Sequence, residues 1–212
     1  QLFRDLGYGA GLISTVKYVI NEVEFPSTHT TPDAIRINSL LAEMVDEGCE
    51  YCFMEVSSHA ISQARIEGLE FTGAAFTNIT HDHLDYHKTF GQYINTKKEL
   101  FDGLSSSAFA LTNKDDRNGS VMVQNCRASR YTYSINSMAD FKGRIIEQDF
   151  NGMLLEVSGK EAWYAQSGKF NAYNLLTVYG IAFLLGVDEN EIITTLSKAH
   201  KVDGRFETIV SP

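Results

Sequence analysis

The chain has 212 residues, with 18 Lys or Arg against 27 Asp or Glu, so its formal net charge is −9. This acidic balance argues against general nucleic-acid binding, which needs a basic face, and no apolar run reaches the roughly 18 residues of a membrane span. An apolar fraction of 43% indicates a folded globular chain, and a content of 3 Cys fits a reducing, cytoplasmic compartment.

The first half of the chain alternates between helix-like and strand-like segments. In chain order, the pattern predicts a helix end at 1–6, a strand at 10–15, a polar stretch, a helix from 31–33 to Gly48, a strand at 50–56, a helix at 58–67, a strand at 71–79, a helix at 90–101 and a strand at 108–112. This alternation predicts an α/β fold, with a mostly parallel sheet sandwiched by helices.

The pattern changes between about residues 130 and 167. Short strand-like segments are separated there by turn signals at 151–152 and 158–159, which indicates a small antiparallel subregion of hairpins. Two helices are then predicted, at 171–185 and 189–200. We interpret 1–212 as one domain with this β-rich subregion inside it.

Polar residues with possible chemistry concentrate between positions 55 and 97. Glu55 ends an apolar strand, where a buried carboxylate would need a cation or donors. The run 81–87 follows the next strand and holds three histidines and two aspartates. Because loops at the carboxyl ends of parallel strands usually form the site, the pattern indicates a divalent-metal centre. A metal-dependent hydrolase and a surface loop with helix-capping aspartates both remain open here.

Several ordered strings carry a more specific resemblance. They are THTTPD at 28–33, MEVSSHA at 54–60, FTNITHDHLDYH at 76–87, YINTKKELF at 93–101, FNAYNLL at 170–176 and GRFE at 204–207. Together they resemble the Mur ligase family, in particular its members that add the third peptide residue to the cell-wall precursor. The resemblance implies a P-loop NTPase-like central domain that uses ATP and Mg²⁺ to form an acyl phosphate, which an amine then attacks.

The resemblance implies roles for individual residues of the metal site. Glu55 and His83 match magnesium ligands, and Lys97 matches a lysine that is carbamylated to hold the second ion. Lys98 competes for that role, but Lys97 shares a helix face with Tyr93, which favours Lys97.

Substrate and nucleotide contacts follow from the same resemblance. Thr30, Thr31, Ser57 and Arg65 match positions that contact UDP-N-acetylmuramoyl-dipeptide, while Asn174 and Arg205 match adenine-side and ATP-phosphate positions. From the residues alone, Thr31 is as good a helix cap as a contact, and Arg65 is as good an ion-pair partner of Glu67 as a substrate ligand.

The resemblance also implies a domain organisation. The chain matches a central ATP-binding domain from just after its phosphate loop, without the UDP-binding and amino-acid-binding domains. We therefore expect the chain alone to be inactive, or a noncatalytic ligand-binding module, and to dimerise through an open sheet edge. Whether the third residue is diaminopimelate or lysine is left open.

Overall fold

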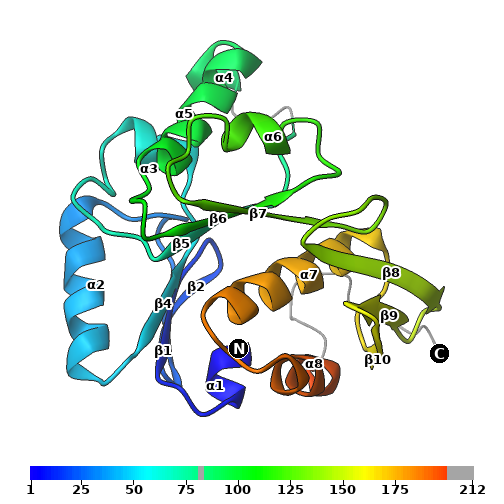
Figure 1. Ribbon diagram of the computed structural model, residues 1–212. Coiled ribbons are helices and arrows are strands. Elements are labelled where there is room, and N and C mark those ends of the chain that lie inside the picture. The colour runs from blue at the N-terminus through cyan, green and yellow to red at the C-terminus, as the bar shows by residue number, and fades with distance from the viewer. Residues whose placement is uncertain (81–83, 200–212) are drawn as a thin grey trace, which may run out of the picture.

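A computed structural model describes residues 1–80 and 84–199 of the chain (Figure 1). The helices are α1 (Leu2–Asp5), α2 (Ala34–Asp46), α3 (Ser58–Ser62), α4 (Leu84–His87), α5 (Phe90–Asp102), α6 (Gly119–Met122), α7 (Lys169–Leu184) and α8 (Glu189–Lys198). The strands are β1 (Ala10–Ile13), β2 (Lys17–Ile20), β3 (Val23–Pro26), β4 (Tyr51–Met54), β5 (Gly73–Phe76), β6 (Phe109–Asn113), β7 (Ser129–Ser134), β8 (Phe141–Gln148), β9 (Met153–Val157) and β10 (Lys160–Tyr164).

The strands form two sheets. The four-stranded sheet has the order β3-β2-β1-β4, in which β1 and β4 are parallel and the other pairs are antiparallel. The six-stranded sheet has the order β10-β9-β8-β7-β6-β5, with β5 to β8 parallel and β8 to β10 antiparallel. The predicted α/β class, with a mostly parallel sheet and a small antiparallel part, is confirmed.

Two local expectations need correction. The stretch taken as polar after β1 contains the β2–β3 hairpin, whose Tyr18, Val19 and Ile20 are buried although charged residues surround them in sequence. The hairpin subregion is also shorter than expected, because β7 pairs in parallel with β6 and β8. Antiparallel pairing begins only between β8 and β9. The turn at 158–159, which joins β9 to β10, has the positive φ angles that a tight hairpin requires.

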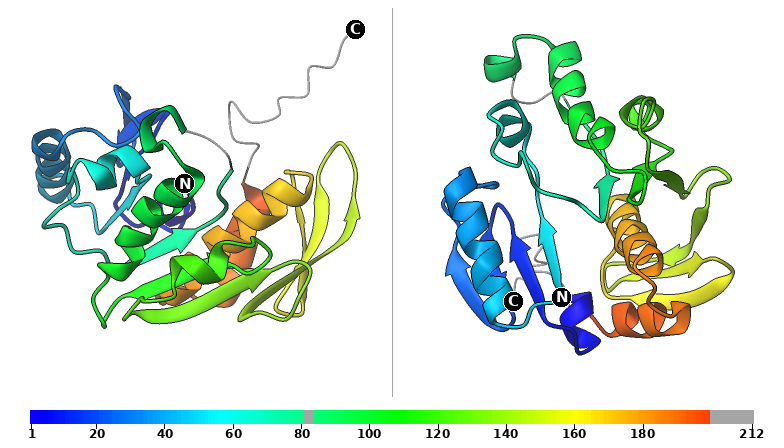
Figure 2. Two further views of the ribbon diagram at one scale, coloured as in Figure 1. Left: turned by 90° about the horizontal axis from the view of Figure 1, so that it is seen from above. Right: turned by 60° about the vertical axis from the view of Figure 1, so that its left-hand side comes forward.

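The helices lie on both sides of the six-stranded sheet. In Figure 1, α5 and α6 lie above β5, β6 and β7, while α7 and α8 lie below them. Figure 2 shows α2 and the β8–β10 hairpins at opposite ends of the molecule. The layered arrangement is therefore that of a helix–sheet–helix sandwich.

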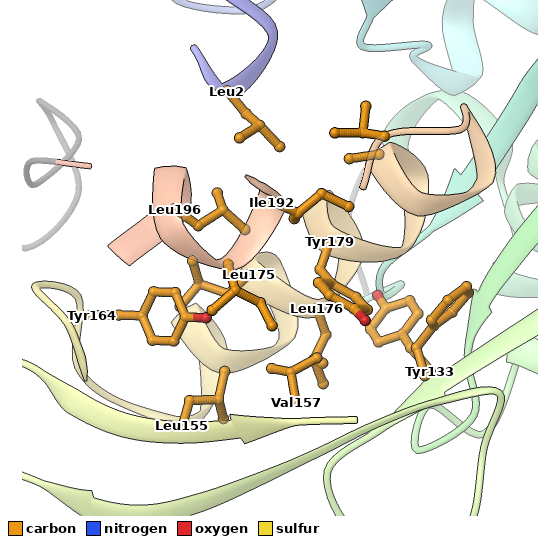
Figure 3. Close-up of a cluster of buried hydrophobic side chains, with 14 of the residues drawn as sticks. Leu2, Tyr133, Leu155, Val157, Tyr164, Leu175, Leu176, Tyr179, Ile192 and Leu196 are labelled. Atoms are coloured by element: carbon orange, nitrogen blue, oxygen red, sulfur yellow. The ribbon is translucent and has the colours of Figure 1, made fainter. Parts of the chain in front are cut away.

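The largest hydrophobic core lies between α7 and the sheet (Figure 3). Leu176 and Tyr179 of α7 pack there with Leu155 of β9 and Ile192 of α8, and all are buried. Tyr51 and Phe53 of β4 and Ala75 of β5 pack against the same cluster. The two sheets therefore share one core, although β4 and β5 are edge strands in their respective sheets.

Helix α2 illustrates how local sequence sets an element. Ile37, Leu40 and Met44 are buried at helical spacing, and the Asp33 carboxylate caps the helix by accepting from the Arg36 N–H at 2.9 Å. Gly48, with φ of +74°, follows the last turn, as predicted. Among the described residues, no helix combines the length and the apolar character needed to cross a membrane.

Candidate functional site

The parallel pair β1 and β4 brings two polar residues together at its carboxyl end. Ile13 pairs with Met54, and the Glu55 N–H continues the ladder by donating to the Ile13 carbonyl at 2.8 Å. Glu55 follows β4 directly, and Thr15 follows β1 after Ser14. Residues 40 positions apart in sequence thus become neighbours because of the strand register.

Glu55 is oriented by two hydrogen bonds to one of its carboxylate oxygens. Its Oε2 accepts from the Thr15 N–H at 2.9 Å and from the Thr15 hydroxyl at 2.6 Å. Its Oε1 accepts no hydrogen bond from any residue that the structure describes. Glu55 is exposed, so the expectation of a buried carboxylate is wrong. Hydrogen bonds from Thr15, and not burial, fix the position of the Glu55 carboxylate.

Thr31 connects the segment before α2 to the segment after β4. Its hydroxyl donates to the Glu55 carbonyl at 2.7 Å and accepts from the Ser57 N–H at 2.9 Å, and the side chain is buried. The helix cap of α2 is Asp33, so the capping alternative for Thr31 is wrong. With both hydrogen-bonding roles used and little exposure, Thr31 contributes to the shape of the site.

Ser57 and Thr30 also lie in this cluster. The Ser57 hydroxyl caps the short helix α3 by accepting from the Ala60 N–H at 3.2 Å. The Thr30 and Thr15 hydroxyl oxygens are 3.1 Å apart, which joins Thr30 to Glu55 through Thr15.

Arg65 follows α3 and faces the same segment. Its Nη1 donates to the Thr31 carbonyl at 2.7 Å, and its Nε and Nη2 donate to Gln63 Oε1 at 3.0 and 2.6 Å. In the described part of the chain Arg65 makes no ion pair with Glu67, so that alternative is wrong. A cavity of about 340 Å³ is lined by Arg65 and Gln63 together with His29, Asp33 and Ala34.

Sequence reasoning missed Thr15 and Gln63. Gln63 stands two positions before Arg65 and three after the MEVSSHA motif, and that closeness was a usable signal. No local pattern marks Thr15, because its relation to Glu55 exists only once β1 and β4 pair.

Lys97 and Lys98 occupy different environments on α5. The Lys98 ammonium lies 2.6 Å from Asp102 Oδ1, one turn later on the helix, and the side chain is buried. The Lys97 ammonium lies 5.4 Å from the centroid of the Tyr93 ring, and burial lowers the pKa of Lys97. Among the described residues no carboxylate pairs with Lys97, so its amine is the more available of the two.

His87 supports the same region from the core. It is buried, with Nε2 2.8 Å from the Ser58 hydroxyl oxygen, and its ring stacks on Tyr93 at 5.2 Å between centroids. The Lys97 ammonium lies over the face of the Tyr93 ring. His87 was expected to be either a core or a surface histidine, and its burial confirms that it is a core histidine.

Three predicted residues remain, Asn174, His83 and Arg205. Asn174 is half-buried on α7, which packs against the six-stranded sheet, and its side chain has no hydrogen-bond partner in the part of the chain that the structure describes. His83 and Arg205 lie outside the described residues.

The donor set can be tested against a magnesium ion. Within the described ranges, no three His, Cys, Asp or Glu side chains are grouped to hold a metal. Glu55 nevertheless offers a fixed carboxylate with one oxygen open, and oxygen is the ligand that Mg²⁺ prefers. His83 lies outside the described residues, so a metal site that combines Glu55, His83 and a carbamylated Lys97 stays a prediction.

Comparison with known proteins identifies relatives over the whole chain. The model of the Mur ligase middle domain matches residues 1–182. The chain is 56% identical over 211 residues to UDP-N-acetylmuramoyl-L-alanyl-D-glutamate–2,6-diaminopimelate ligase of Cytophaga hutchinsonii, covering 100% of the chain and 43% of the relative. It is 55% identical over 210 residues to the ligase of the same name from Bacteroides thetaiotaomicron, covering 99% and 44%.

Solved structures agree on the fold. A ligase of the same name has a TM-score of 0.87 at 24% identity, covering 100% of this chain and 45% of that one. MurF from Acinetobacter baumannii has a TM-score of 0.78 at 15% identity, covering 99% and 45%. The chain thus spans less than half the length of each of these four proteins.

Proposed function

Since the chain belongs to the Mur ligase family through its middle domain, we propose that it is the central part of an ATP-dependent ligase that adds diaminopimelate to UDP-N-acetylmuramoyl-L-alanyl-D-glutamate. The observation that carries the proposal is the 56% identity to a diaminopimelate ligase across the whole chain. The choice of diaminopimelate over lysine, left open by the sequence, comes from the names of these relatives.

Glu55 at the end of β4 and Lys97 on α5 support a phosphoryl-transfer chemistry. We assign Glu55, His83 and carbamylated Lys97 to Mg²⁺, which when bound supplies positive charge to a transferring phosphoryl group. The lowered pKa of Lys97 favours its neutral amine, the form that reacts with carbon dioxide. Lys98, held by Asp102, is a poor alternative because carbamylation would break this partly buried ion pair.

The neighbouring cavity supports binding of the anionic precursor. We assign Thr30, Thr31, Ser57 and Arg65 to UDP-N-acetylmuramoyl-dipeptide, and add Gln63 because it lines the cavity beside Arg65. Arg65 presents a planar guanidinium, which suits a carboxylate or a phosphate. Because Thr31 is buried and fully hydrogen-bonded, its part is to position the backbone around Glu55 and Ser57.

Nucleotide contacts come from two further positions. We assign Asn174 to the adenine side of ATP, since a half-buried amide with no partner in the described residues is open to a ligand. Arg205 is assigned to the ATP phosphates on its motif alone, because it lies outside the described residues.

The test uses the whole protein that contains this chain. Purified protein is incubated with ATP, Mg²⁺, UDP-N-acetylmuramoyl-L-alanyl-D-glutamate and either diaminopimelate or lysine, and ADP and amide product are measured. Formation of the amide product with diaminopimelate but not with lysine supports the proposal. Phosphate release without amide product would instead favour the metal-dependent hydrolase.

Two lysine variants sharpen the test. Lys97→Ala should abolish most ligation, and a small carboxylate such as acetate should partly restore it by occupying the vacated position. Lys98→Ala should keep ligation, measured at a temperature where both variants remain folded. An active Lys97→Ala protein with an inactive Lys98→Ala protein would show that the assignment is wrong by one residue.

A further inference from the structure

We propose that Thr15 is a positioning residue that orients the Glu55 carboxylate for metal binding and links it to the precursor site. This inference rests on the proposed function, because Glu55 is assigned there to Mg²⁺. Thr15 lies outside all the motifs that carried the family resemblance. What points to it is its contact with Glu55.

The first observation is how the hydrogen bonds are divided between the two oxygens of Glu55. Both donors of Thr15, its N–H and its hydroxyl, approach Oε2, at 2.9 and 2.6 Å. Oε1 receives no hydrogen bond from the residues described. Two donors on one oxygen hold the carboxylate in one orientation and leave the other oxygen for a cation.

The second observation is that Glu55 is exposed. An exposed glutamate on a strand end otherwise samples several rotamers, and binding a metal would cost the entropy of fixing it. The hydrogen bonds from Thr15 reduce this cost before the metal arrives. Such support for a ligand by a neighbouring donor typically changes metal affinity about 10-fold or more.

The third observation explains why the Thr15 N–H is not used by the β1–β2 ladder. Strand β1 ends at Ile13, and the chain turns into β2 with the Ser14 hydroxyl donating to the Lys17 carbonyl at 2.9 Å. Thr15 is at the tip of this turn, so its N–H takes no part in the β1–β2 ladder. It is therefore available to the carboxylate from the neighbouring strand.

The fourth observation extends the contact to the precursor site. The Thr15 hydroxyl faces two acceptors, Glu55 Oε2 at 2.6 Å and the Thr30 hydroxyl oxygen at 3.1 Å. The shorter contact, to the charged oxygen, is the stronger of the two. The Thr15 hydroxyl thus lies between a residue assigned to the precursor and a residue assigned to the metal.

The experiment measures Mn²⁺ binding to the whole protein, with free Mn²⁺ followed by electron paramagnetic resonance. Thr15→Val keeps the side-chain shape and the N–H but removes the hydroxyl donor, so Mn²⁺ should bind about 10-fold more weakly. Thr15→Ser restores the hydroxyl and should bind within about 2-fold of the unmodified protein, because the donor geometry is kept. Rescue by serine separates positioning from a general loss of packing.

Two control variants make the outcome decisive. Thr72→Val makes the same chemical change at an exposed threonine whose side chain has no hydrogen bond among the described residues, and it should leave Mn²⁺ affinity unchanged. Glu55→Gln should lose most binding. Loss with Glu55→Gln but none with Thr15→Val would overturn the role of Thr15 alone. An unmodified protein that binds no Mn²⁺ would overturn both this role and the metal site of the proposed function.

Discussion

Two carboxylates follow strand ends in this molecule and have opposite hydrogen-bonding environments. Glu55, after β4, is exposed and has one oxygen held by Thr15 and the other open. Asp115, after β6, has both oxygens occupied: Oδ1 accepts from the Ser134 hydroxyl at 2.7 Å, and Oδ2 accepts from the Tyr173 hydroxyl and the Ile135 N–H, each at 2.9 Å.

The difference separates a structural carboxylate from an available one. Asp115 joins the β7–β8 connection to α7, and its bonds are fully used in holding those segments together. Glu55 is oriented but not saturated, which is the state a ligand of a cation needs. Position at a strand end alone therefore does not identify a functional carboxylate, whereas the number of donors around each oxygen does.

The largest effect is expected at Asp115. Asp115→Ala removes the acceptor of the Tyr173 hydroxyl, and it leaves the hydroxyl of Ser134, a residue that is 0% exposed, with only the longer contact to Ser137 at 3.1 Å. Because unsatisfied buried donors and lost charged hydrogen bonds each cost free energy, the free energy of unfolding should fall by about 3 kcal/mol. Urea unfolding measures it.

Asp46→Ala is the matched control for that variant. Asp46 is an exposed residue at the end of α2, with no side-chain hydrogen bond in the described part of the chain, so its loss should change stability by less than about 0.5 kcal/mol. Equal effects of the two substitutions would contradict a structural role for Asp115.

The second effect compares the adjacent lysines of α5. Lys98→Met removes a buried ammonium from Asp102 and should lower the free energy of unfolding by about 1 kcal/mol, a modest loss because Asp102 still reaches water. Lys97→Met should cost less, since Lys97 has only the Tyr93 ring beneath it. A larger loss with Lys97→Met would mean that Lys97, not Lys98, is the structural lysine.

The third effect is the pH dependence that Asp115 adds to stability. Burial by itself raises the pKa of Asp115, but hydrogen bonds from Ser134, Ile135, Tyr173 and Asn136 outweigh it and lower the pKa. The resulting stabilisation is present above the unfolded-state pKa of about 4 and is lost as pH falls through the lower pKa of the folded state. Urea unfolding at about pH 6, 4 and 3 should therefore show a shallower decline for Asp115→Asn; an unchanged slope would contradict the assignment.

The smallest effect is expected at Glu55. Glu55→Gln should change the free energy of unfolding by less than about 0.5 kcal/mol, since the side chain is exposed and its amide oxygen still accepts from Thr15. Thermal and urea unfolding test this directly. A loss comparable to that of Asp115→Ala would make Glu55 a structural carboxylate as well.

Much of the fold was predictable because it depends on local burial. The helix predicted at 90–101 is α5 (Phe90–Asp102), and the strand predicted at 108–112 is β6 (Phe109–Asn113). Such segments are long or strongly apolar, so periodicity alone identifies them. The β2 and β3 strands were missed because each has four residues and the segment carries several charges. Too few residues remain there for an alternating apolar pattern to be recognised.

The candidate site was predictable only where a motif marked it. Glu55, Ser57 and Lys97 were identified within motifs and Arg65 by a matching position after one, and the assignment of each to a ligand remains a prediction. Gln63 was missed although it is close to Arg65 in sequence.

The sequence by itself determined which segments become helices and strands and which side chains are candidates, because spacing along one segment sets the face it buries. Tertiary structure decided which candidates meet. Pairing of β1 with β4 places Thr15 against Glu55, and the return of the chain after α3 places Arg65 against Thr31. It also decided that Lys98 and not Lys97 is held by Asp102, and that Asp33 and not Thr31 caps α2. These outcomes depend on strand register and on competition between neighbouring partners, and neither is encoded in the periodicity of a single segment.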